Sequence, residues 1–129
     1  MTNELNFEAG LKEIIEIIEL EEQKPVLVAV HGPPNAGKSY LIEQLVKCFS
    51  AKGVDIVPSE GYFPPTSPDE LKSPEYLCDI FLFHLAGERR PHYNSVHLNI
   101  GIFNPKLHPE FEKEYDVVIS NPESNIKIT

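Results

Sequence analysis

The stretch VLVAVHGPPNAGKSYLIEQL, residues 26–45, constrains the fold of this chain more than any other segment. Its first five residues form a continuous apolar run rich in valine, which is typical of a strand buried on both faces of a parallel sheet. Residues 32–37 contain two glycines and two prolines, a composition that predicts a turn. From residue 38 to residue 51 the apolar side chains recur at helical spacing. The segment therefore predicts a strand, a glycine-rich turn and a helix in direct succession.

The turn, GPPNAGKS at residues 32–39, has the pattern of a phosphate-binding loop. Consecutive backbone N–H groups at the N-terminus of a helix form a site for polyphosphate. Proline has no N–H, so the amides of the cradle are expected from residues 35–39. Lys38 would bridge the β and γ phosphates of ATP, and the Ser39 hydroxyl would hold Mg²⁺. The predicted nucleotide-binding residues are Gly32, Asn35, Ala36, Gly37, Lys38, Ser39 and Tyr40.

The rest of the chain alternates helical and strand patterns. Residues 6–23 place apolar and acidic side chains on opposite faces, which predicts an amphipathic helix with solvated glutamates. Further strands are predicted near residues 54–57, 79–85, 96–103 and 115–120, with an edge strand over 126–129, whereas residues 61–74 are expected to be irregular. This order predicts an α/β fold, a three-layer α/β/α P-loop domain with a mainly parallel sheet of about five strands. We expect one nucleotide-binding domain over residues 1–129, with the helix of residues 1–24 packed on it.

Composition limits the partners of the chain. Eleven basic residues against 20 acidic ones give a formal charge of −9, which would repel a polyanion and disfavours nucleic acid as a partner. The apolar runs are too short for a membrane span, and the N-terminus lacks a signal-peptide pattern, so we expect a cytoplasmic protein. Cys48 and Cys78 lie in apolar patterns, and buried free thiols are expected there. Four of the five histidines, His84, His92, His97 and His108, have no zinc-ligand spacing with either cysteine.

Phosphoryl transfer by such a loop usually needs a second carboxylate at the end of an apolar strand. The run over residues 80–83 is followed by His84, and the run over 117–119 is followed by Ser120-Asn121, with Glu123 as the nearest acid. Asp79 and Asp116 precede their strands, and we expect them at the opposite end of the sheet. The expected acid is therefore missing from both strand ends.

The segment SEGYFPP at residues 59–65 resembles the acid-Gly-aromatic stretch of the uridine kinase, pantothenate kinase and phosphoribulokinase family. In that family the acid receives the proton of the substrate hydroxyl, so the resemblance implies that Glu60 is catalytic, together with Lys38. Residues 87–97, GERRPHYNSVH, are similar to the family's "G…P-x-Y…H" segment. The resemblance implies an acceptor site that contains Tyr62, Arg89, Arg90, Tyr93 and His97.

The resemblance extends from residue 26 to residue 123, and its specific part is the phosphate loop. Asn99 stands where the family has an arginine, and the family's Glu-Gly pair is absent after residue 119. The chain is also expected to end before the family's lid and adenine site. Arg89 and Arg90, its two arginines, would then have to replace the arginines of that lid.

Three functions stay open on the sequence. The leading one is a kinase that transfers phosphate from ATP to a hydroxyl of a small, nucleoside-like acceptor. The loop also resembles that of GTPases and of helicase-type ATPases, although no Asp-x-x-Gly in a switch position and no Asn-Lys-x-Asp follows it. A degenerate, non-catalytic nucleotide binder is the third, because the strand-end acid is missing. The sequence leaves open the preference for ATP or GTP and the oligomeric state, a homo-oligomer included.

Overall fold

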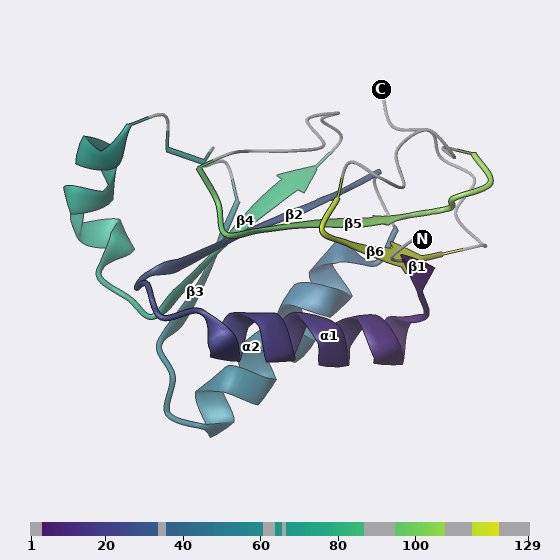
Figure 1. The fold of residues 1–129 in the computed structure, drawn as a ribbon, viewed down its shortest axis with the longest axis horizontal. Helices are drawn as coiled ribbons and strands as arrows, with labels where there is room; N and C mark the ends of the chain where they lie inside the picture. The colour runs from purple at the N-terminus through teal and green to yellow at the C-terminus, as the bar shows by residue number, and fades with distance from the viewer. Residues whose placement is uncertain are drawn as a thin grey trace.

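A computed structural model describes residues 4–33, 36–60, 64–65, 67–86, 95–107 and 115–121. The strands among these residues form one sheet. They are all parallel and have the order β1-β6-β5-β2-β4-β3 (Figure 1). The five longer strands are β2 (Val26–Gly32), β3 (Ile56–Glu60), β4 (Ile80–Ala86), β5 (Leu98–Phe103) and β6 (Val117–Ser120). The sixth, β1 (Glu4–Leu5), has two residues and pairs with β6 at one edge.

Numbered along the chain, the five longer strands have the order 2-3-1-4-5, with the strand before the phosphate loop in the centre. The predicted α/β fold with a parallel sheet of about five strands is thus confirmed. The short β1 was not predicted. The edge strand predicted over residues 126–129 lies outside the described residues.

Two α-helices, α1 (Phe7–Leu20) and α2 (Lys38–Ala51), cover the same face of the sheet (Figure 1). The Asn6 side chain caps α1 by accepting a hydrogen bond from the N–H of Ala9 at 2.8 Å, a typical N-cap interaction. Apolar side chains of both helices form one core with alternate residues of the central strands; these include Ile14, Ile18, Leu41, Leu45, Val28, Val30, Leu82 and Ile100. Burial of this face accounts for the amphipathic pattern of both helices.

The opposite face of the sheet has a smaller, aromatic core. Phe81, Phe83 and Leu85 of β4 point to this face, and Tyr76 packs on them with its ring centroid 4.8 Å from that of Phe81. Tyr76 belongs to the 3-10 helix η2 (Pro74–Tyr76), which follows η1 (Pro68–Lys72). Within the described residues, short 3-10 helices therefore pack where a longer helix often covers such a sheet. The helix η1 forms within residues 61–74, which the sequence predicted to be irregular, and η2 begins at the last residue of that segment.

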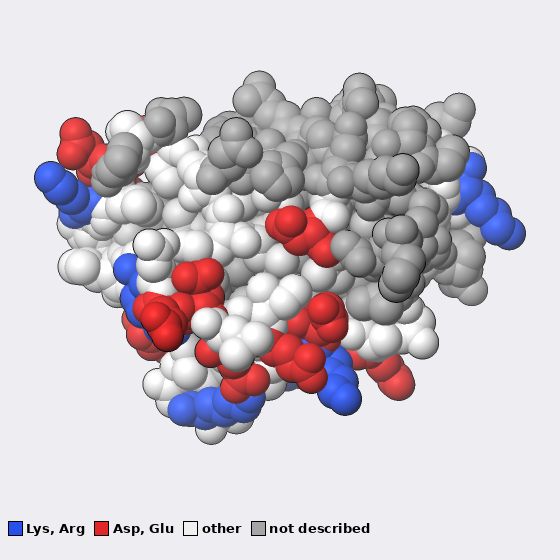
Figure 2. Space-filling model, in the orientation of Figure 1, with Lys and Arg blue, Asp and Glu red and all other residues white. Residues whose placement is uncertain are grey.

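The surface carries the acidic character of the sequence. Figure 2 shows acidic side chains gathered over α1 and α2, with a few lysines among them. Glu8, Glu13, Glu16 and Glu19 of α1 are exposed, as the predicted solvated face requires. Both cysteines are free, as predicted, but they are half-buried rather than buried. No helix among the described residues combines the length and the apolar content of a membrane span.

Candidate functional site

The phosphate loop connects β2, the central strand, to the N-terminus of α2. Gly37 has a φ of 109°, which L-amino acids with a side chain rarely adopt, and it directly precedes the helix. Gly32 allows a close approach, because a Cβ atom on it would lie 2.3 Å from the carbonyl oxygen of Ile102 in β5. The backbone of the loop therefore requires glycine at both positions, 32 and 37. Asn35, one of the predicted nucleotide-binding residues, lies outside the described residues.

Lys38 is buried at the start of α2, with 4% of its surface exposed. Its Nζ atom donates hydrogen bonds to the carbonyl oxygens of Gly32 and Pro33, the latter at 2.7 Å. Burial lowers the pKa of Lys38 from 10.5 to about 8, because desolvation disfavours the ammonium form. An anion in this loop would restore the missing counter-charge. Lys38 thus lies where it could contact a phosphate group, and a phosphate there would stabilise its buried ammonium form.

Asn121, directly after β6, connects the loop to the sheet. Its Nδ2 atom donates to the carbonyl oxygen of Ala36 at 2.8 Å, and its backbone N–H donates to that of Phe103 in β5 at 2.8 Å. Asn121 and Ala36 line a pocket of about 420 Å³ together with Tyr40, Phe7 and others. Tyr40 is 56% exposed, and its ring centroid lies 5.0 Å from that of Phe7. This pocket, next to the phosphate loop, offers an exposed aromatic ring to a planar group.

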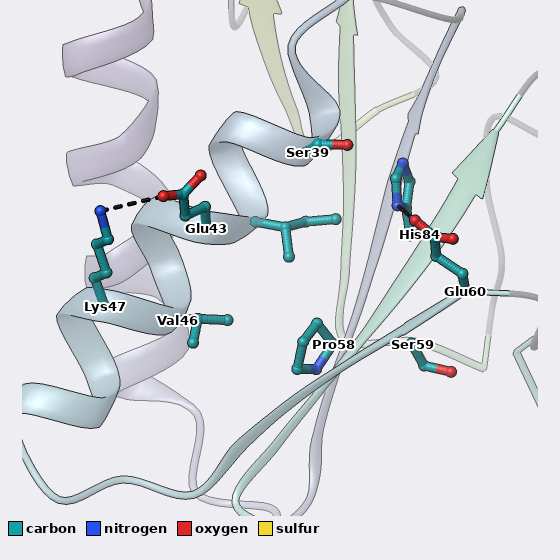
Figure 3. Close-up of a pocket in the computed structure, with 9 residues that line it drawn as sticks. Ser39, Glu43, Val46, Lys47, Pro58, Ser59, Glu60 and His84 are labelled. Carbon is teal, nitrogen blue, oxygen red and sulfur yellow. Dashed lines mark ion pairs between the residues drawn. The ribbon is translucent and has the colours of Figure 1, made fainter.

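Ser39 lines a second pocket, of about 510 Å³, between α2 and the ends of β3 and β4. Its helix wall includes Ile42 and Val46, and its strand wall includes Pro58, Glu60 and His84. Figure 3 shows the Ser39 side chain pointing from the first turn of α2 toward the side where His84 and Glu60 lie. We call this space the α2 pocket. It joins the phosphate loop to the strand ends where an acid was expected.

Glu60 and His84 are paired on the strand wall of this pocket, and the pair is ionic only when the imidazole is protonated. Their Cα atoms are register partners in the parallel strands β3 and β4, and Nδ1 of His84 lies 3.1 Å from Oε1 of Glu60. The His84 side chain is 13% exposed, whereas that of Glu60 is 81% exposed. The imidazole is thus held in the wall while the carboxylate lies at the surface of the pocket.

The sequence missed this pair for two reasons. The second strand was predicted over residues 54–57, but β3 runs to Glu60, so Glu60 ends a strand instead of standing in the loop that follows. His84 was noted only as the residue found where an acid was expected. The usable signal was alternation along β4, because Ile80 and Leu82 pack in the core under α2, and His84 has the same parity.

An oxygen ligand for Mg²⁺ is present beside the loop. Mg²⁺ prefers oxygen ligands and binds through one or two protein groups plus phosphates and water. The Ser39 hydroxyl lines the α2 pocket and is of this type, whereas the Glu43 carboxylate is paired with Lys47 at 3.2 Å (Figure 3). No group of three or more His, Cys, Asp and Glu side chains that could hold a metal ion occurs among the described residues. The Ser39 hydroxyl fits one position in the coordination of a Mg²⁺ ion whose other ligands would be phosphates and water.

His97 does not belong to this site, contrary to the acceptor role that the resemblance implied. Its Nδ1 accepts a hydrogen bond from the N–H of Leu27 at 2.9 Å, and its Nε2 lies 3.0 Å from Oε1 of Gln23. Leu27 is at the beginning of β2, whereas Lys38 follows its end. The parallel register explains the error, because a residue that precedes β5 must lie at the amino end of the sheet.

The two aspartates that were assigned to the amino end of the sheet do lie there. Oδ2 of Asp79 accepts a hydrogen bond from the N–H of Asp55 at 2.8 Å, and Oδ2 of Asp116 accepts one from Asn99 at 2.7 Å. Asp79 thus caps an N–H group just before β3, and Asp116 caps one within β5. The other predicted acceptor residues, Tyr62, Arg89, Arg90 and Tyr93, lie outside the described residues, as does Glu123.

Comparison with known proteins supports the fold. No protein-family model and no curated protein sequence matches the chain. A solved structure, that of a possible uridine kinase from Bacillus stearothermophilus, matches it with a TM-score of 0.61 and 12% sequence identity. The match covers 88% of this chain and 98% of that one. At this identity the likeness concerns the fold, and the chain therefore has the α/β fold of the P-loop kinases, with an all-parallel sheet around the strand that leads into the phosphate loop.

Proposed function

We propose that this protein is an ATP-binding phosphotransferase that transfers the γ-phosphoryl group to a hydroxyl of a small, nucleoside-like molecule. One observation carries the proposal: the Glu60–His84 pair and Ser39 line one pocket beside the phosphate loop. A kinase needs a nucleotide site, a metal ligand and a proton acceptor within reach of one acceptor hydroxyl. The α2 pocket, of about 510 Å³, has room for a small acceptor next to all three.

The nucleotide is assigned to the loop because the loop and Lys38 offer a helix N-terminus and a buried cation to its phosphates. Ser39 would hold the Mg²⁺ that shields the charge of the β and γ phosphates. The base is assigned to the pocket lined by Tyr40 and Asn121, where the exposed ring supplies stacking area.

Binding is tested by thermal shift with Mg·ATP on the parent protein and on Lys38→Ala. At a hundredfold excess over the dissociation constant, ATP should add about 2.7 kcal/mol of stability. Lys38→Ala should remove most of this gain, because it deletes the cation of the loop. Lys72→Ala, an exposed lysine of η1, is the matched control and should keep the gain. An equal stabilisation of Lys38→Ala and the parent would rule the loop out as the ATP site.

Transfer is tested by single-turnover reactions with γ-labelled ATP and a panel of nucleosides and small alcohols. Glu60→Gln keeps the size of the side chain and removes its charge, so ATP binding should persist while transfer falls by about 10²-fold or more. Glu75→Gln, an exposed glutamate of η2, is the matched control and should transfer like the parent. Equal rates for the parent and Glu60→Gln would exclude Glu60 from the reaction.

A non-catalytic nucleotide binder is the alternative, favoured by one observation. The strands β4 and β6 reach the phosphate-loop end of the sheet with Ala86 and Ser120, and His84 stands two residues before the end of β4, so none of these positions carries a carboxylate. Under this alternative ATP would stabilise the parent protein as above, but no acceptor in the panel would receive the label.

A further inference from the structure

The α2 pocket contains one side chain that the proposed reaction has not used. His84 faces the same side of the sheet as α2, because Ile80 and Leu82 at alternate positions of β4 pack in the core beneath that helix. Its ring nitrogens differ in their surroundings. Nδ1 is paired with Glu60, whereas no hydrogen bond to Nε2 is found within the part of the chain that the structure describes. In Figure 3 the second ring nitrogen is turned toward the end of the pocket where Ser39 lies.

The pairing with Glu60 determines which nitrogen can accept a proton. A carboxylate can only accept a hydrogen bond, so Nδ1 must carry the hydrogen in the pair. In the neutral imidazole Nε2 then has the free lone pair. The carboxylate would also stabilise the imidazolium that forms when Nε2 is protonated. The pair thus has the arrangement of a base and the group that orients it.

Burial separates the roles of the two residues. His84 is 13% exposed and lies in β4 between β2 and β3, opposite Val30 and Glu60, whereas Glu60 is 81% exposed. A general base works best when it is held in one geometry beside the hydroxyl whose proton it accepts. The half-buried imidazole is therefore the better placed proton acceptor.

We infer that His84 is the general base of the transfer reaction and that Glu60 is the positioning residue that holds its ring. The inference rests on the proposed phosphotransferase function and changes the role that the resemblance gave to Glu60. Nε2 takes the proton of the acceptor hydroxyl while the hydroxyl oxygen forms a bond to the γ-phosphorus. The bond from the γ-phosphorus to the bridging oxygen breaks, and its electron pair leaves with ADP. The imidazolium then releases its proton to water.

His84→Ala is the decisive variant. It should lower single-turnover transfer by about 10²-fold or more and leave the ATP-induced thermal shift unchanged. Added imidazole should restore part of the rate, because the deleted ring leaves space in a pocket that opens to solvent. With substituted imidazoles the restored rate should rise with their basicity, which a merely structural role for His84 would not produce. Glu75→Gln should neither lose transfer nor respond to imidazole.

The orienting role of Glu60 has a readout that does not need activity. In nitrogen-15 NMR spectra of the imidazole at a pH where His84 is neutral, the parent should carry its proton on Nδ1. Glu60→Ala should shift the population toward the Nε2-protonated form. His84→Asn, which is close to histidine in size, replaces His84→Ala if the alanine variant does not fold, and it should lose transfer by the same factor.

The outcomes separate the two proposals. If the parent transfers phosphate and His84→Ala transfers equally well, or is slow and unresponsive to every imidazole, His84 is not the base and the phosphotransferase function stands. A parent imidazole protonated on Nε2 would also overturn the inference. If the parent binds ATP but transfers to no acceptor, the proposed function fails, and the inference fails with it.

Discussion

Lys38 makes the stability of the protein depend on pH in a direction that is unusual for a lysine. A lysine that gains a partner on folding has a raised pKa, but burial lowers the pKa of Lys38 to about 8. Between pH 8 and 10.5 the unfolded chain therefore binds a proton at this residue more strongly than the folded chain does. The free energy of unfolding should then rise with pH across this window, because the folded state no longer has to bury an ammonium group.

The size of the effect follows from the two pKa values. The difference between 10.5 and about 8 corresponds to up to about 3.5 kcal/mol, at about 1.4 kcal/mol for each tenfold change in proton affinity. The full cost of the charged form is present below pH 8 and is relieved as pH approaches 10.5. For a domain of ordinary stability this is a large fraction of the free energy of unfolding.

The assay compares urea unfolding of the parent and of Lys38→Met at several pH values from 7 to 10.5. Methionine has a similar length and no charge, so other titrating groups contribute equally to both proteins and cancel in the difference. The parent should be the less stable protein near pH 7, and the gap between the two should narrow as pH rises. Two curves that stay parallel across the whole range would refute the argument that burial disfavours the charged lysine.

The protonation of Lys38 should also affect nucleotide binding. Phosphate beside Lys38 favours the ammonium form, so ATP should bind with proton uptake above pH 8, and its affinity should fall about tenfold for each further pH unit. Isothermal titration calorimetry in buffers of different ionisation enthalpy measures this uptake. Binding at pH 9 without proton uptake would show that Lys38 does not contact the phosphates.

Three other predictions address the loop, the base pocket and the far end of the sheet. Gly32→Ala should cost more than about 2 kcal/mol, since its Cβ atom would meet the carbonyl oxygen of Ile102; urea unfolding measures the loss, and a wild-type midpoint would contradict it. ATP and GTP should differ in affinity by less than about tenfold, or 1.4 kcal/mol, because stacking on the Tyr40 ring does not distinguish the two purines; competition binding measures the difference, and a larger preference would contradict it. Asp79→Ala should lose about 1 kcal/mol of stability through its bond to Asp55 and leave the ATP-induced thermal shift intact, and a reduced shift would contradict its position at the far end of the sheet.

The parts of the fold that sequence alone predicted are those with a strong local pattern. The helix over residues 38–51 was predicted with the bounds that α2 has, because apolar spacing and a glycine before its first residue agree. The predicted strand ends were less accurate. The second strand was predicted over residues 54–57, whereas β3 runs from Ile56 to Glu60. Pro58 and Glu60 are poor strand formers, and it is pairing with β4 that makes them part of a strand.

The candidate site likewise has one part that the sequence predicted and one part that it did not. The phosphate loop is contiguous in sequence, so its glycines and Lys38 could be identified from spacing alone. The Glu60–His84 pair joins residues from two strands through their register, which no local pattern contains. His97 shows the reverse case, because a motif match suggested a role that the direction of β5 rules out.

Each edge of the sheet that the described residues form has a feature that disfavours pairing with a strand of another chain. An all-parallel sheet exposes unpaired backbone groups along its outer strands, which can template the addition of another chain. At one edge β1 is two residues long and offers little for an incoming strand to pair with. At the other edge β3 contains Pro58, which has no N–H and interrupts any continuous ladder. Pro58, which lines the α2 pocket, thus also disfavours the addition of a further strand at this edge.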